Sequence, residues 1–291
     1  MAACSIAPSQ PRRSDGRMAR RVLPGFGLSL GITLAWLSLI VLMPLAAVFL
    51  KAAGLGVSGL WEIWSDARVA SALKLSFLAS LAAAAFSAVM GTLVAWVLVR
   101  YRFPGRRLLD AIIDLPFALP TAVAGIALTA LYAGNGWIGQ WLEPFGAKVA
   151  YTQAGIVVAL VFIGLPFVVR SVQPVLAESD RALEEAAATL GASRMTTIRR
   201  VVLPAIWPAV LTGFALAFAR AVGEYGSVIF IAGNLPNVSE IAPLLIVIRL
   251  EEFDYPGATA IAAAMLLLAF ALLLTIHALQ SFMARHRGAV R

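Results

Sequence analysis

Six long apolar segments dominate this chain, and they constrain its fold more than any other feature of the sequence. Each exceeds the roughly 20 residues that an α-helix needs to cross a lipid bilayer. The chain has 291 residues, of which 61% are hydrophobic and only 13% are charged. A soluble domain is usually about 45–50% apolar and about 25% charged. The sequence therefore predicts an all-α, polytopic membrane protein with six transmembrane helices, at approximately residues 25–50, 70–99, 110–133, 154–177, 206–233 and 257–283.

The basic residues indicate how these segments are oriented. Most of the 23 lysines and arginines lie before the first segment, after the second, after the fourth and after the sixth. The positive-inside rule places such loops in the cytoplasm, so both termini of this multi-pass protein are expected there. The net charge of +8 is explained by these loops, and no nucleic-acid partner is expected.

The predicted domains are a tail and one membrane domain. Residues 1–22 are rich in Arg, Ser and Pro and are expected to be a disordered cytoplasmic tail, with residues 23–291 as the transmembrane domain. An organelle transit peptide and a true start at Met18 are alternatives for the tail. The single cysteine, Cys4, rules out an intrachain disulfide, and two histidines are too few for a histidine-based metal centre.

Proline and small residues predict irregular, closely packed helices. Pro116 and Pro120 lie near the start of the third segment, and Pro166 and Pro174 interrupt the fourth. Ser87 and Gly91 are four residues apart in the second segment and would let a neighbouring helix approach closely.

The polar interval between the fourth and fifth segments predicts a pair of short amphipathic helices. Asp180 is placed to cap the first helix, and Gly191 to end it with a positive φ angle. Between them, one helical face carries Leu183, Ala186, Ala187 and Leu190. This face is expected to rest on the chain's own helices, with Glu184 and Glu185 turned outward.

The second helix of the pair has its own start and stop signals. Ser193 is expected to cap it, and Pro204 is expected to end it. Met195, Ile198 and Val202 share one face. A capped amphipathic pair between membrane segments is typical of a part that docks onto something outside the membrane.

Arg220 and Glu224 are predicted to lie within the fifth membrane segment, where a charge costs roughly 2.5–3.5 kcal/mol on insertion scales. A spacing of four residues places them on one helical face, where they can pair. One interpretation is a structural salt bridge. The other is that Arg220 lines a path for an anion while Glu224 positions it.

Sequence motifs for nucleotide binding and proteolysis are either absent or lie in a context that excludes their usual function. Residues 134–139 match a dinucleotide-binding pattern but follow a membrane segment rather than a strand. The sequence contains no phosphate-binding loop for ATP and no Gly-x-Ser-Gly motif of an intramembrane serine protease. ATP hydrolysis by this chain is therefore not expected.

The helix pair resembles a conserved loop of ATP-binding-cassette importer permeases. The similar residues are Glu185-Ala186-Ala187, Gly191, Val201 and Leu203-Pro204, with Val201 where the family usually has Ile. The resemblance implies the type I importer fold, with coupling helices at about 178–204 that dock onto a separate ATPase. It also implies that Glu185 faces the ATPase and that Gly191 makes the turn. The coupling residues implied are Glu184, Glu185, Ala186, Ala187, Gly191, Leu203 and Pro204.

Further stretches narrow the resemblance. Residues 115–125, 220–233 and 241–246 are similar to the sulfate/thiosulfate permeases, and the molybdate/tungstate permeases are the nearest alternative. This family implies two ATP-binding subunits, a homologous second permease and a periplasmic anion-binding protein as partners. ATP and magnesium would bind to the ATPase, so this transport subunit would need no cofactor of its own. The expected translocation path or gate comprises Arg220, Glu224 and Tyr225. A different class, an ATP-independent anion transporter or channel, would leave the helix pair as a plain loop.

Overall fold

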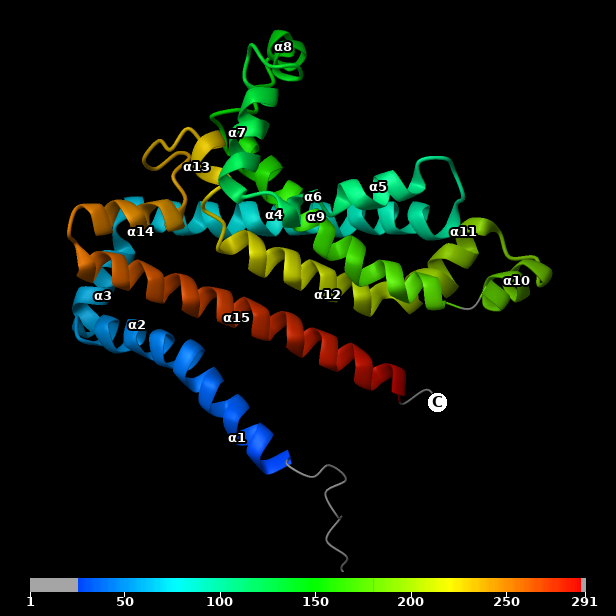
Figure 1. Ribbon diagram of the computed structural model, residues 1–291, viewed down its shortest axis with the longest axis horizontal. Coiled ribbons are helices and arrows are strands. Elements are labelled where there is room, and N and C mark those ends of the chain that lie inside the picture. Colours follow the sequence, from blue (N-terminus) through cyan, green and yellow to red (C-terminus); the bar gives the residue numbers. More distant parts are fainter. Residues whose placement is uncertain (1–25, 180, 289–291) are drawn as a thin grey trace, which may run out of the picture. The chain divides into compact units, whose positions relative to one another are not determined.

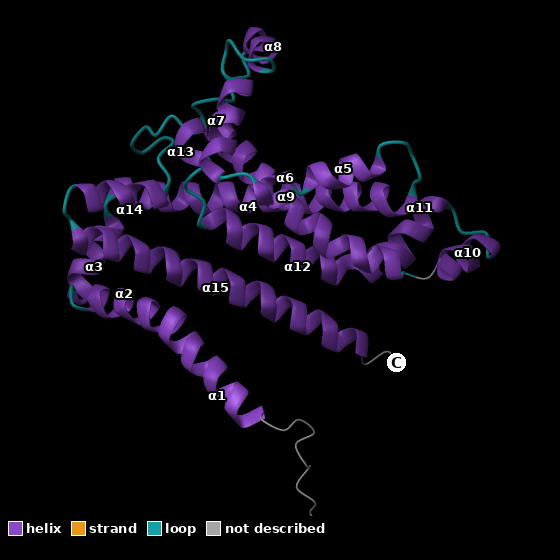
Figure 2. Ribbon diagram, viewed as in Figure 1, coloured by secondary structure: helices purple, strands orange, loops and turns teal. Residues whose placement is uncertain are grey.

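The computed structural model of the protein describes residues 26–179 and 181–288. Within these ranges the chain is helical with short loops and contains no strand, which confirms the all-α prediction (Figures 1 and 2). Residues 1–22, the predicted tail, lie outside the described part, as does Asp180, the predicted cap.

The chain divides into two units, Met1–Ala47 and Val48–Arg291. The described part of the first unit contains α1 (Phe26–Leu37), a π-helical turn (Ser38–Leu42) and the beginning of α2 (Met43–Ala53). Residues 26–47 include no charged side chain, and helix from Phe26 to Ala53 is long and apolar enough to cross a membrane. Apolar side chains such as Leu28 and Trp36 are exposed, as lipid-facing residues are.

Three long helices form the centre of the second unit. They are α4 (Ala67–Arg100), α9 (Gln153–Glu178) and α12 (Leu203–Val222), and each packs against the other two (Figure 1). Gly91 of α4 and Gly213 of α12 both face Val168 of α9, and a Cβ atom at either glycine would lie less than 3 Å from Val168. The small residues thus permit the close approach that Ser87 and Gly91 predict.

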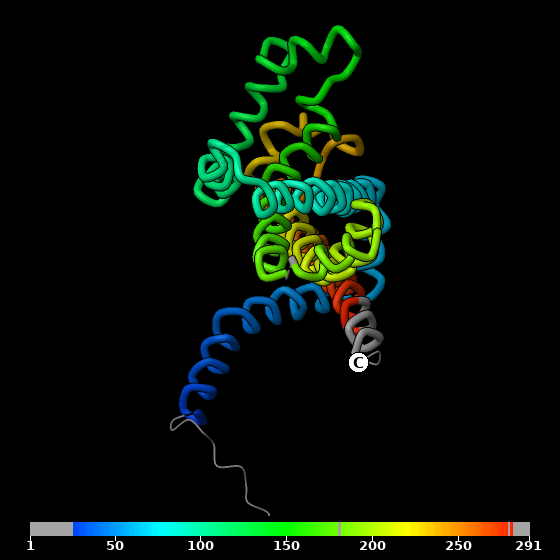
Figure 3. Tube along the Cα trace, turned by 90° about the vertical axis from the view of Figure 1, so that its right-hand side faces the viewer, coloured from blue at the N-terminus to red at the C-terminus, as the bar shows by residue number. Residues whose placement is uncertain are grey.

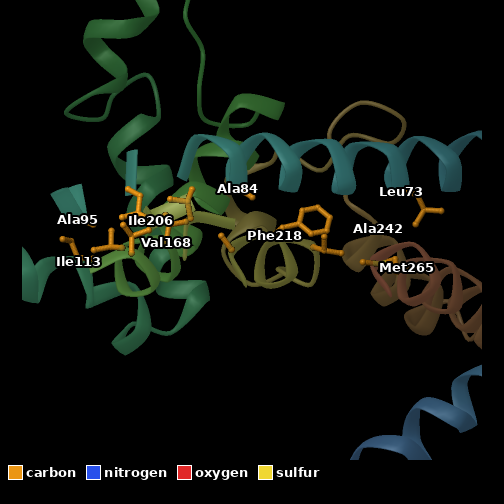
Figure 4. Close-up of a cluster of buried hydrophobic side chains, with 14 of the residues drawn as sticks. Leu73, Ala84, Ala95, Ile113, Val168, Ile206, Phe218, Ala242 and Met265 are labelled. Carbon is orange, nitrogen blue, oxygen red and sulfur yellow. The ribbon is translucent and has the colours of Figure 1, made fainter. Parts of the chain in front are cut away.

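The main buried cluster runs along these helices. Figure 4 shows Ala84 and Phe218 near its middle, Val168 and Ile206 toward one end, and Leu73, Ala242 and Met265 toward the other. The last two residues come from α14 (Ala242–Glu251) and α15 (Tyr255–Gly288), which pack together. Figure 3, turned by 90°, shows α7 extending away from the long helices.

The fourth predicted segment is a continuous helix despite its prolines. Pro166 and Pro174 both lie inside α9, so the expectation that they interrupt it is wrong. Proline is tolerated within membrane helices because neighbouring helices and hydroxyl side chains satisfy the freed backbone groups.

The third predicted segment, 110–133, is bent rather than straight. It contains α5 (Arg106–Ile113), α6 (Leu115–Ala118) and α7 (Thr121–Tyr132), and the chain turns by 116° between Ala118 and Thr121. Pro120 precedes α7 and forces the residue before it, Leu119, into an extended conformation. The irregularity that these prolines predict is therefore present, but it is a sharp bend.

The fifth predicted segment, 206–233, ends early. The α12 helix stops at Val222, and a four-residue helix, α13 (Val228–Ile231), follows after a non-helical stretch. The α14 helix (Ala242–Glu251) was not predicted, and it is too short to span a bilayer alone. The remaining helices are short: α3 (Gly56–Ser65), α8 (Gly139–Leu142) with a 3₁₀ turn (Glu143–Phe145), α10 (Arg181–Thr189), and α11 (Arg194–Thr197) with a π-helical turn (Ile198–Val202).

By length and composition, the described residues contain five helices able to cross a membrane, or six if the bent pair of residues 106–132 counts as one span. The five match the predicted first, second, fourth, fifth and sixth segments in place. The chain is therefore a multi-pass membrane protein.

Candidate functional site

The predicted helix pair lies at one end of the long helices. Figure 1 shows α10 and α11 beyond the ends of α9 and α12, far from α14 and α3 at the other end. The α10 helix ends as its sequence predicts. Gly191 has φ of 80°, the N–H of Ala192 donates to the carbonyl of Ala187 at 3.0 Å, and the N–H of Gly191 donates to that of Ala188 at 3.0 Å. These two bonds are the Schellman arrangement that satisfies a helix end.

The second helix begins as predicted but does not end as predicted. The Oγ of Ser193 accepts a hydrogen bond from the N–H of Thr196 at 3.3 Å, which confirms the cap. Pro204, however, does not end the helix, since helix continues from Arg194 to Val222. A π-helical turn directly precedes the proline. Its wider spacing relieves the clash that a proline ring makes with the preceding turn. The second helix of the pair and the fifth membrane segment thus form one continuous helix.

The faces of α10 differ in part from the expectation, because Glu185 is exposed as expected whereas Glu184 is half-buried. Glu184 forms a salt bridge with Arg100 at the end of α4, and Arg100 also reaches Ser179 at 3.5 Å. Leu183 is 60% exposed and Leu190 is 88% exposed, so the two leucines of the apolar face do not rest on the described part of the chain. The reason is that an arginine at the end of α4 binds the carboxylate and turns the leucines away.

A cleft of about 390 Å³ separates α10 from α4 and α11. Arg194 spans it by donating to the hydroxyl of Tyr101 at 2.8 Å. Glu185 lines the cleft and is exposed. Leu203 and Pro204, which lie outside the cleft lining, are also exposed. Ala187 is half-buried, whereas Ala186 is exposed. The helix pair therefore presents an apolar, solvent-accessible surface beside the Arg100–Glu184 salt bridge.

Arg220 and Glu224 form the predicted pair, but not on one continuous helix. Arg220 lies in the last turn of α12, and Glu224 follows the end of that helix. One carboxylate oxygen of Glu224 binds Nη1 of Arg220 at 2.5 Å. The other accepts from the N–H and the Oγ of Ser227 at 2.9 and 3.0 Å. Glu224 is only 3% exposed, whereas the Arg220 side chain is 37% exposed.

The stretch after α12 is held tightly against the start of α7. A Cβ atom on Gly125 would collide with the backbone of Ser227, and one on Gly226 would collide with the hydroxyl of Thr121. Tyr225 is half-buried beside this contact. The predicted gate residues thus lie where the broken third segment meets the broken fifth segment, with the guanidinium of Arg220 accessible.

The ionic clusters around Arg170 and Arg68 were not predicted from the sequence. Arg170 of α9 donates to both carboxylate oxygens of Asp114, at 2.8 and 2.6 Å, and to a carboxylate oxygen of Asp110 at 2.8 Å. At the other end, Arg68 binds the two oxygens of the buried Glu240 at 2.8 and 2.7 Å. Both arginines lie toward the ends of apolar segments, where the positive-inside rule uses them to orient the chain in the membrane. Their acidic partners are distant in sequence, so residue spacing does not reveal the pairs. No group of three His, Cys, Asp or Glu in the described ranges could hold a metal ion.

Comparison with known proteins identifies the family. Residues 87–288 match the model of the binding-protein-dependent transport system inner membrane component. The sulfate transport system permease protein CysT of Salmonella typhimurium is 51% identical over 92% of this chain and 96% of its own length. The chain belongs to the CysT family of inner membrane transport components. It is thus a membrane subunit of an ATP-binding-cassette importer and not an enzyme.

Other relatives and solved structures agree with this assignment. This permease is 49% identical to CysT of Synechocystis over 88% of the chain and 89% of that protein. A bacterial transporter for the import of alginate has a TM-score of 0.73 at 16% identity, covering 88% of this chain and 94% of the other. The methionine transporter MetNI has a TM-score of 0.55 at 18% identity, covering 74% and 96%. These structures confirm the type I importer permease fold.

Proposed function

We propose that this chain is the permease subunit of an importer that moves sulfate or thiosulfate across a bacterial inner membrane. The observation that carries the proposal is 51% identity, over 92% of the chain, to a permease named for sulfate transport. The accessible guanidinium of Arg220, held by a buried carboxylate, suits a path for a dianion. Molybdate and tungstate are the competing substrates.

The proposed partners are two ATP-binding subunits, a homologous second permease and a periplasmic sulfate/thiosulfate-binding protein. ATP and magnesium would be bound by the ATP-binding subunits, so no cofactor is assigned to this chain. The α10–α11 pair is proposed as the docking surface for one ATP-binding subunit, with Leu183 and Leu190 offering apolar contacts. Both termini would lie in the cytoplasm, on the same side as this surface.

The proposed mechanism is alternating access driven from outside the chain. Closure of the ATP-binding subunits would move α10 and α11. The unbroken helix from Arg194 to Val222 would carry that movement to Arg220 at its other end. The Arg100–Glu184 pair and the Arg194–Tyr101 bond would make α4 follow. The chain would thus convert a movement outside the membrane into exposure of a polar path.

Competition uptake tests the substrate. Cells that depend on this importer are given labelled sulfate with excess thiosulfate or molybdate. Thiosulfate is expected to suppress uptake, and molybdate is expected to leave it nearly unchanged. Suppression by molybdate alone, without suppression by thiosulfate, would overturn the assignment.

Gly191→Pro tests the docking role in the same assay. Proline removes the N–H that binds Ala188 and cannot adopt the φ of 80°. Sulfate uptake is expected to fall at least tenfold while the protein stays in the membrane. Gly146→Pro is the matched control, because Gly146 has φ of 77° and donates to Glu143 at 2.8 Å in a loop far from α10. Equal loss of uptake in both variants would count against a docking role.

A further inference from the structure

A single lysine near the other end of α4 has no counter-ion. Lys74 is exposed, and its ammonium forms no salt bridge with any side chain that the structure describes. The neighbouring Arg68 is fully engaged with Glu240, and that pair neutralises its own charge. The ammonium of Lys74 is therefore available to an anionic ligand.

Lys74 lines a cleft of about 510 Å³ between α4, the start of α9 and the loop before α14. The wall near the lysine is polar. The Oγ of Ser71 is 3.2 Å from Oδ1 of Asn237, and Nε2 of Gln153 donates to the carbonyl of Val238 at 2.6 Å. These bonds hold the loop over the cleft. The rest of the lining is apolar and comprises Leu75, Leu78, Ala79, Ala82, Val157 and Val238.

The position of this cleft in a membrane follows from the length of α4. Its 34 residues extend about 51 Å at 1.5 Å per residue, whereas the hydrocarbon core of a bilayer is about 30 Å thick. If the helix is centred, about 10 Å projects at each end. Lys74 follows the first residue, Ala67, by about 10 Å. It thus lies at the boundary of headgroups and hydrocarbon, while Leu78 and Ala82 lie one and two turns deeper.

We infer that this cleft binds an anionic phospholipid of the leaflet opposite the α10–α11 pair. The phosphate of the headgroup would contact the ammonium of Lys74, and one acyl chain would lie along the apolar groove toward Ala82. The cleft has a positive charge and polar side chains at its mouth and an apolar wall deeper in the membrane. The phosphate and the acyl chain of a phospholipid follow each other in the same order.

A free sulfate or phosphate ion fits the same cleft less well. Such an ion must exchange its hydration shell for hydrogen bonds, and burial without them is costly. The cleft offers one cation, and its deeper wall is apolar. The lipid assignment is independent of the transported anion, because it rests only on the cleft and its depth in the membrane.

Native mass spectrometry of the full-length chain tests the inference. The protein is released from detergent micelles containing dioleoyl phosphatidylglycerol or dioleoyl phosphatidylcholine, and retained lipids are counted. Wild type is expected to retain one phosphatidylglycerol per chain in preference to phosphatidylcholine. Lys74→Gln is expected to lower that retention about fivefold, the effect of one basic residue near an anionic surface. Lys148→Gln, which removes another exposed lysine outside the cleft, is the matched control.

Two further measurements separate the lipid from other occupants. Ala82→Phe fills the groove and keeps the charge, so it is expected to lower retention as well, while Lys74→Arg is expected to preserve it. Displacement of the lipid from wild type by millimolar inorganic sulfate would overturn the inference in favour of a free-anion site. Equal retention by wild type and Lys74→Gln would overturn it outright. If Lys74→Gln fails to fold, the Lys74→Arg variant and the sulfate competition still test the inference.

Discussion

At the scale of single residues, the Arg220–Glu224 pair shows how far charge spacing predicts a contact. Two opposite charges four residues apart predict the pair, and the structure confirms it. The end of α12 at Val222 and the bonds from Ser227 to Glu224 were not predictable. They depend on the packing of α7 against the stretch after α12, which no local pattern encodes. Glu224 is consequently buried, and Arg220 is the accessible partner.

This asymmetry allows the structural and the transport roles of the pair to be separated. Arg220→Met leaves the Glu224 carboxylate buried with only Ser227 as a donor. We expect a loss of about 3 kcal/mol in stability, at the low end for a broken buried pair because Arg220 is partly exposed. The double variant Arg220→Met with Glu224→Gln removes both charges, and Gln can still accept from Ser227. Its stability is expected to lie within about 1 kcal/mol of wild type.

The measurements are thermal unfolding of the purified protein and sulfate uptake by cells with equal amounts of protein in the membrane. If Arg220 lines the anion path, the stable double variant fails to take up sulfate. Normal uptake by the double variant would leave the pair with a structural role alone.

At the scale of elements, the sequence predicts the helix pair better than its orientation. The signals at Gly191 and Ser193 are local hydrogen-bonding preferences, and both are confirmed. The direction of α10 depends instead on Arg100, which is more than 80 residues away in sequence. The stop expected at Pro204 was wrong because a π-helical turn accommodates the ring. Long-range ion pairs and helix irregularities are the features that local patterns miss.

The Arg100–Glu184 pair is expected to keep α10 in place for docking. Arg100→Ala removes a half-buried salt bridge and its contact with Ser179. We expect the free energy of the docked position of α10 to rise by about 1 kcal/mol, which corresponds to about fivefold lower occupancy of that position. The readout is the ATP hydrolysed per sulfate imported by the reconstituted importer, which is expected to rise. Exchange of the two charges, Arg100→Glu with Glu184→Arg, is expected to recover part of the coupling.

Arg102→Ala is the matched control for this prediction. Arg102 is exposed, two residues further along the chain, and forms none of the salt bridges found in the described residues. The same loss of coupling in Arg102→Ala would show that general positive charge, rather than the anchor of α10, is responsible.

At the scale of the whole molecule, composition predicts the class of protein and hydropathy predicts the spans. Five of the six predicted segments coincide with helices that can cross a membrane. The exception, 110–133, is apolar enough, but Pro120 and the contact of Gly125 with Ser227 impose a bend of 116°. Hydropathy measures whether a segment tolerates lipid, and it carries no information on direction. The division of residues 1–22 from 23–291 stays a prediction.

The orientation of the molecule in the membrane follows from the positions of its basic loops. The loop between α4 and α5 and the α10–α11 pair lie at one end of the long helices, and the loop after α8 belongs to the region beyond α7 (Figure 1). The positive-inside rule assigns the first end to the cytoplasm because of its arginines. Each end offers an exposed position. Arg107 is the second residue of α5, and Ala147 follows the 3₁₀ turn after α8.

Cysteine labelling tests this orientation in a Cys4→Ser background, which removes the only native thiol. In intact sphaeroplasts, a membrane-impermeant maleimide is expected to modify Ala147→Cys, while Arg107→Cys is expected to react only after lysis. Sulfate uptake by each variant verifies that the labelled protein is the functional one. Labelling of Arg107→Cys in intact sphaeroplasts would reverse the orientation. The α10–α11 pair would then face away from any cytoplasmic ATPase, and the proposed docking could not occur.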